Sequence, residues 1–126
     1  MKQIIIVIIG IIAIIAVSLY ANIYLKTSAQ NIAPHINNIG IYSQRQDWNS
    51  ASKEMKLLES KWSSVKSVWS MLIEHQEIDN VEVSMDRVSK YVESKNSSDA
   101  LAESASLGLF IEHIPETYEL NLGNIF

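Results

Sequence analysis

The first 26 residues form an apolar run between two lysines. No residue between Lys2 and Lys26 is charged, and nine of the fourteen residues from Ile4 to Val17 are isoleucine. As a helix this run is about 34 Å long at roughly 1.5 Å per residue, which exceeds the roughly 30 Å of a bilayer's hydrocarbon core. The pattern therefore predicts a transmembrane anchor over residues 1–26, with residues 3–25 in lipid, followed by a domain over residues 27–126.

A cleaved signal peptide is the alternative, because Ala16-Val17-Ser18 has the small-x-small form of a cleavage site. The apolar run continues beyond this site as far as Leu25, which favours a retained anchor. The amino terminus and Lys2 lie on one side of the span and Lys26 on the other, so the positive-inside rule places the amino terminus in the cytoplasm. We therefore expect a single-pass protein of the cell membrane with residues 27–126 outside the cytoplasm.

The strongest periodic signal lies in the middle of the chain, where apolar residues alternate at three- and four-residue spacing. This pattern predicts an amphipathic helix over about residues 47–75, with Asp47 as its N-cap. Three tryptophans share the stripe, which is more typical of a core than of a ligand platform. The stripe consists of Trp48, Ala51, Met55, Leu58, Trp62, Val65, Trp69 and Leu72.

Two further helices are predicted after it. Asp79-Asn80-Val81-Glu82 has the form of a capping box, which predicts a helix from about residue 80 to Lys95. Another is expected from Asp99 to Ile114, ended by Pro115, with close approach of a neighbouring helix at Gly108. Its expected buried residues are Leu101, Ala105, Leu107, Phe110, Ile111 and Ile114.

The segment Asn31–Arg45 also has helical spacing but contains Pro34, where the membrane helix either bends and continues or stops and restarts. Short connections between amphipathic helices imply antiparallel neighbours. The predicted fold class is therefore all-α: a transmembrane helix followed by a small antiparallel bundle of three to four helices. A coiled coil between copies is the alternative, although tryptophan and alanine suit such a seam poorly.

One tripeptide occurs twice, as Ile73-Glu74-His75 and Ile111-Glu112-His113, each at a predicted helix C-terminus. In the predicted bundle both histidines lie at one end, near two carboxylates of the connection. Two histidines and two carboxylates suit zinc. A histidine in a last helical turn also complements the helix dipole, and we favour this structural role, so no metal or cofactor is predicted. The candidate binding residues are His75, Glu77, Asp79 and His113.

Composition narrows the classes of function. The chain has a net charge of −4 and no basic cluster, which argues against nucleic acid as a partner. It has no cysteine, which excludes disulfides, thiolate zinc sites and a thiol nucleophile. No phosphate-binding loop, serine elbow or His-Glu-x-x-His motif occurs, so we do not expect an enzyme.

The ordered set of these features resembles a family of uncharacterised small single-pass membrane proteins, a domain of unknown function, from Gram-positive spore-forming bacteria. The resemblance implies an exported helical domain and brings no known activity or catalytic residues. It rests on the isoleucine-rich span, Asp47-Trp48, Trp62, Trp69, the stretch from His75 to Asn80, the stretch from Glu112 to Glu116, and Asn124-Ile125-Phe126.

The sequence thus predicts a membrane-anchored helical domain that binds or scaffolds another envelope or membrane protein. The expected contact is either the bundle end near His75 and His113 or the terminal segment Tyr118–Phe126, whose apolar residues dock on the bundle or await a partner. The alternative function is a metal- or small-ligand-binding sensor that uses the paired histidines.

Overall fold

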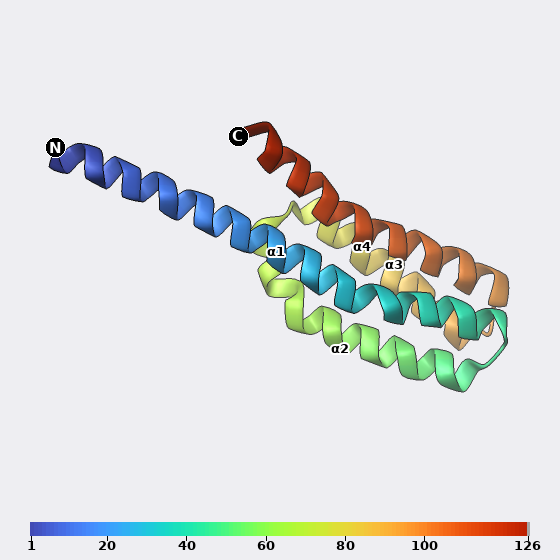
Figure 1. Ribbon diagram of the computed structural model, residues 1–126. Coiled ribbons are helices and arrows are strands. Elements are labelled where there is room, and N and C mark those ends of the chain that lie inside the picture. Colours follow the sequence, from blue (N-terminus) through green and yellow to red (C-terminus); the bar gives the residue numbers. More distant parts are fainter. Residues whose placement is uncertain (126) are drawn as a thin grey trace.

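A computed structural model describes the backbone of residues 1–125 and the side chains of residues 1–119. Within these residues the chain folds into four α-helices and no strands (Figure 1). The predicted all-α class and the helical bundle are confirmed. The helices are α1 (Lys2–Gln44), α2 (Trp48–Leu72), α3 (His75–Glu93) and α4 (Ser97–Ile125).

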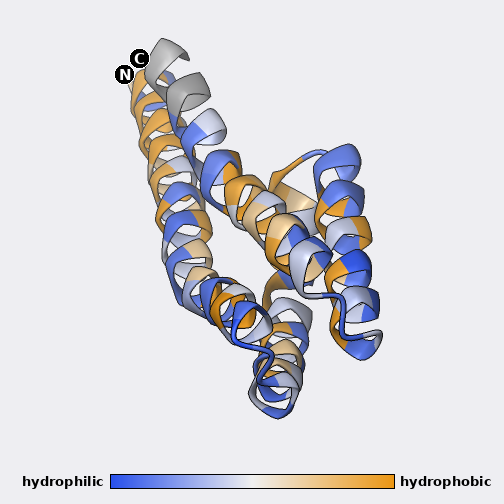
Figure 2. Ribbon diagram, turned by 90° about the vertical axis from the view of Figure 1, so that its right-hand side faces the viewer, coloured by the Kyte–Doolittle hydropathy of each residue, from blue (hydrophilic) through white to orange (hydrophobic). Residues whose placement is uncertain are grey.

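Helix α1 runs without interruption from the apolar amino-terminal segment into the bundle (Figure 1). Its first part projects beyond the other helices in Figure 1 and is mostly hydrophobic in Figure 2. From Leu25 onwards one face is buried in the core. Pro34 lies inside the helix and is exposed, so the helix continues through it. Apolar residues buried on both sides of Pro34, such as Ile32 and Ile36, offset the hydrogen bond that proline removes.

Helix α2 follows the prediction closely. Asp47 is its N-cap, and its carboxylate accepts hydrogen bonds from the Ser50 amide at 3.2 Å and the Ser50 hydroxyl at 2.8 Å. The helix ends at Leu72, a few residues before the expected end at residue 75. Five residues of the predicted stripe are buried, so the stripe is a core face; they are Ala51, Met55, Leu58, Trp62 and Trp69.

The predicted start of α3 near residue 80 is wrong. The helix begins at His75, and Asp79 is an exposed residue inside it rather than a cap. Ile78 is buried, which extends the apolar stripe upstream of the capping-box pattern. The Glu74 amide at the N-cap position donates to the Tyr118 hydroxyl at 2.9 Å, so a tertiary contact marks this helix start.

The predicted limits of α4 are also wrong. The helix begins at Ser97 rather than at Asp99, and the side-chain oxygen of Asn96 caps its first turn by accepting from the Asp99 amide at 3.2 Å. Pro115 lies within the helix, which continues to Ile125. The buried stripe contains Ala100, Ser104, Leu107, Ile111 and Ile114, whereas the expected core residues Leu101, Ala105 and Phe110 are exposed.

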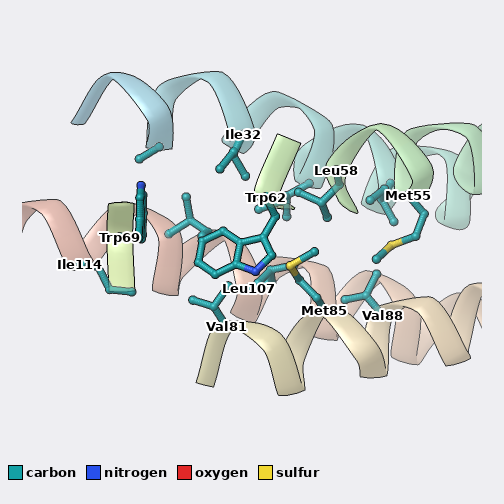
Figure 3. Packing of buried hydrophobic residues seen from close by; sticks show 14 of the residues in the cluster. Ile32, Met55, Leu58, Trp62, Trp69, Val81, Met85, Val88, Leu107 and Ile114 are labelled. Atoms are coloured by element: carbon teal, nitrogen blue, oxygen red, sulfur yellow. The ribbon is translucent and has the colours of Figure 1, made fainter. Parts of the chain in front are cut away.

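The four helices form an antiparallel ring in which α1 packs against α2 and α4, and α3 packs against the same two. Trp62 lies at the centre of this core, close to Leu58, Met85 and Leu107 (Figure 3). The Trp62 and Trp69 rings meet edge to face, with centroids 5.4 Å apart and planes at 76°. The predicted core role of the tryptophan stripe is therefore confirmed for this pair.

Candidate functional site

The four predicted site residues do not form a cluster. His75 is exposed at the start of α3, and His113 is exposed on α4, where its Nδ1 lies 3.5 Å from a Glu116 carboxylate oxygen. In residues 1–119 no three histidine, cysteine or acidic side chains are grouped so that they could hold a metal ion. Glu77 and Asp79 lie within the first turns of α3, not in a connection.

The predicted capping role of both histidines is wrong, because both helix ends were misplaced. His75 begins a helix, so it lies at the positive end of the helix dipole, where a cation is unfavourable. His113 lies in the interior of α4, and its carbonyl accepts the Thr117 hydroxyl at 2.9 Å. Neither histidine meets the open carbonyls of a last helical turn.

The structure instead pairs a histidine that is not among the predicted site residues. His35 Nδ1 on α1 lies 2.6 Å from Glu54 Oε2 on α2, and the two side chains are 20% and 17% exposed. Glu54 directly precedes Met55, which is buried in the core. No local pattern in the sequence indicates this pair, because its residues come from two helices and the sequence leaves the course of α1 at Pro34 open.

A groove of about 430 Å³ follows the seam between α1 and α4. Gly40 accounts for the close approach, because a Cβ there would lie 2.9 Å from Ser104 Oγ. The predicted neighbour at Gly108 is Ile36, whose Cγ2 would lie 3.7 Å from an added Cβ, an ordinary contact. The groove is lined by Ala33, Ile36, Asn37, Gly40, Ile41 and Gln44 of α1 and by Leu101, Ser104, Ala105, Gly108, Leu109 and Glu112 of α4.

A second hollow of about 210 Å³ continues this groove towards the projecting part of α1, since both share Ala33 and Glu112. Lys26 lines it on α1, and Glu116 and Glu119 line it on α4. Two leucines of the main groove remain in contact with solvent, with Leu101 at 38% and Leu109 at 54% exposure. The seam therefore combines a small-residue floor, exposed apolar side chains and an acidic end.

Helix α1 is the one helix within the described residues that is long and apolar enough to cross a membrane, and none of its most apolar stretch is buried. The side chain of Tyr118 is described in the terminal segment Tyr118–Phe126, which was predicted to dock on the bundle or to await a partner. It packs against the core, and its hydroxyl accepts a hydrogen bond from the Glu74 amide. The side chains of residues 120–126 lie outside the described part of the chain.

These features define an all-α bundle protein with a long apolar helix and a groove between its first and last helices. The chain belongs to the family described as a domain of unknown function (DUF4363), whose model matches residues 19–125. The predicted membership in a family of unknown function is thus confirmed. No curated protein matches the chain significantly, and no solved structure does.

Proposed function

We propose that this protein is a single-pass membrane protein whose bundle lies outside the cytoplasm and binds another membrane protein through the α1–α4 groove. The observation that carries the proposal is the continuity of α1, which joins an exposed apolar span to the bundle core in one helix. The expected origin in Gram-positive spore-forming bacteria stays a prediction.

Retention of the span is supported by the residues that follow the candidate cleavage site. Cleavage after Ser18 would leave Leu19, Tyr20 and Ile23 on a helix projecting into water, where they are 57–70% exposed. In a bilayer the same side chains face lipid, and the tyrosine suits the interface. Transfer of this surface from water to lipid is favourable by roughly 25 cal/mol per Å².

The groove suits an apolar helix with basic flanking residues. Its floor is formed by small side chains, which permit close approach of another helix, and its leucines offer apolar contact area. Glu112, Glu116 and Glu119 lie at the end nearest the span, where they complement basic residues at a membrane surface. A partner helix in the same bilayer reaches this end directly as it leaves the lipid.

Site-specific crosslinking in cells tests the proposed groove. A photoreactive amino acid at Ala105, which is exposed and lines the groove, should trap one specific membrane protein. The matched control is the same amino acid at Ala102, which is exposed on the same helix but does not line the groove. Equal products from both positions, or recovery of uncrosslinked monomer alone, would count against the groove as the contact.

Protease treatment of intact cells tests the orientation separately. Residues 27–126 should be degraded while the span is retained in the membrane. Protection of the domain until the cells are lysed would place it inside the cell and refute the proposed location. The sensor alternative receives no support from the described residues, because His75 and His113 are not grouped with carboxylates that could complete a ligand set.

A further inference from the structure

The height of the bundle above the bilayer is determined by α1, because no linker separates the span from the core. Ile4 to Ile23 cover about 30 Å at roughly 1.5 Å per residue, which matches the hydrocarbon core. Ile23 is 62% exposed, whereas Leu25 is 2% exposed and already belongs to the bundle. The core therefore begins about 3 Å along the helix axis from the last lipid-facing isoleucine.

The turn between α2 and α3 lies at this same end of the bundle. Trp69 Nε1 donates to Ser28 Oγ at 2.7 Å, which places the end of α2 beside the part of α1 that enters the core. Because α1 and α2 are antiparallel, the second residue after Trp69 lies about 3 Å nearer the span than Trp69 does. Met71 occupies this position and is 77% exposed, although it is apolar.

We infer that the α2–α3 turn forms a second membrane contact, with Met71 inserted at the boundary between lipid headgroups and acyl chains. This inference rests on the proposed anchor. The partner is the bilayer that holds α1, since that helix brings the turn to the membrane surface. Methionine is flexible and apolar, so it adapts to a disordered layer. Tyr20 and Tyr24 on α1 lie at the same boundary, which tyrosine prefers.

A contact at this turn gives the bundle two attachment points instead of one. With α1 alone, the bundle could lean in any direction about the exit point of the helix. With Met71 in the interface, the α2–α3 turn is also held at the bilayer surface. The consequence is a fixed orientation of the α1–α4 groove relative to the membrane plane.

Depth-dependent fluorescence quenching on the full chain tests this inference. The chain has no cysteine, so the single substitutions I23C, M71C and L57C each provide one site for an environment-sensitive fluorophore. Leu57 is the matched control: it is exposed on the same helix two heptads before Met71, and therefore lies on nearly the same face about 21 Å farther from the membrane. The labelled chains are reconstituted into phosphatidylcholine vesicles with nitroxide-labelled acyl chains as the quencher.

We expect the label at position 23 to lose most fluorescence, the label at position 71 to lose a clearly measurable part, and the label at position 57 to lose none. Loss at position 23 without loss at position 71 would overturn the second contact and leave the anchor intact. Absence of loss at position 23 would overturn the anchor itself, so the two failures are distinguishable.

A longer α1 provides a second variant. Seven polar helix-forming residues inserted between Ile23 and Tyr24 lift the bundle by about 10 Å and change the helix face by only about 20°. Quenching of the label at position 71 should then disappear while that at position 23 is retained. Persistent quenching at position 71 would show that α1 does not set the contact and would overturn the inference.

Discussion

Substitution of Gly40 by alanine tests the packing of the α1–α4 seam most directly. The added Cβ would lie 2.9 Å from Ser104 Oγ and 3.3 Å from Leu101 Cδ1, so one of these side chains must move. Ser104 is buried, and its hydroxyl donates to the Leu101 carbonyl at 2.9 Å. Rotation of that hydroxyl away from Cβ therefore breaks this hydrogen bond at a side chain that is only 3% exposed.

The magnitude follows from opposing terms. A buried polar group left without a partner costs about 1–3 kcal/mol, and crowding of Leu101 adds roughly 1 kcal/mol. Alanine in place of a helical glycine contributes about 0.5–1 kcal/mol in the opposite direction. We therefore expect Gly40→Ala to lower the free energy of unfolding by about 1–3 kcal/mol.

Gly108→Ala is the matched control, because its Cβ would meet Ile36 Cγ2 at the ordinary distance of 3.7 Å. Here only the propensity term acts, and stability should rise by about 0.5–1 kcal/mol. Thermal unfolding of the full chain in detergent micelles, followed by tryptophan fluorescence, measures both, at roughly 4–8 °C per kcal/mol for a domain of this size.

Two results would refute this reasoning. If Gly40→Ala melts at or above the wild-type temperature, the seam is not as closely packed as the distances indicate. Ser104→Ala removes the nearest atom, so the double variant should recover part of the loss through a positive coupling. If the loss in the double variant equals that of Gly40→Ala alone, the Ser104 hydroxyl is not its cause.

The same unfolding assay checks three further predictions. Ser28→Ala leaves the buried Trp69 Nε1 without its acceptor and should cost about 1–3 kcal/mol, and an unchanged melting temperature would contradict that role. Pro34→Ala restores an amide inside α1 and should stabilise the chain by up to about 3 kcal/mol, whereas a loss would mean that the proline ring makes a needed contact. Leu107→Ala removes a fully buried side chain and should cost about 2–5 kcal/mol, against a change within about 0.5 kcal/mol for the exposed Leu109→Ala.

The second helix was predictable because its signals are local. Its apolar spacing identifies one face over many turns. Asp47 lies three residues before Ser50, and its carboxylate accepts a hydrogen bond from the Ser50 amide. Neither feature depends on where another helix lies. The same holds for the long apolar stretch at the start of α1, whose length and composition are visible in the sequence alone.

The ends of α3 and α4 were mispredicted because tertiary contacts override local signals there. The capping-box pattern at Asp79 competes with an earlier start that buries Ile78 and satisfies the Glu74 amide through Tyr118. On α4 two neighbouring stripes are apolar, and the buried one is chosen by the positions of α1 and α3. Local spacing therefore could not decide between Leu101 and Ala100.

The histidine hypothesis depended on these helix ends and failed with them. A cluster of His75, Glu77 and Asp79 with His113 requires a loop at residues 75–79, where the structure has a helix. Prediction of the His35–Glu54 pair would have depended on a different point, namely that α1 continues past Pro34. Candidate residues taken from sequence were thus only as reliable as the elements that carried them.

The core face of α1 contains two serines whose tertiary contacts can be recognised only in the folded structure. Ser28 and Ser43 occupy buried positions in register with Ile32, Ile36 and Ile39, so they weaken the stripe in the sequence. The Ser28 hydroxyl marks a tertiary attachment, because it accepts from Trp69 Nε1 at one end of the bundle. At the other end it is the main-chain carbonyl of Ser43 that accepts from the Ser97 hydroxyl. These two contacts attach α1 to α2 near the span and to α4 at the far end, so the helix that enters the proposed membrane is also the helix around which the bundle is assembled.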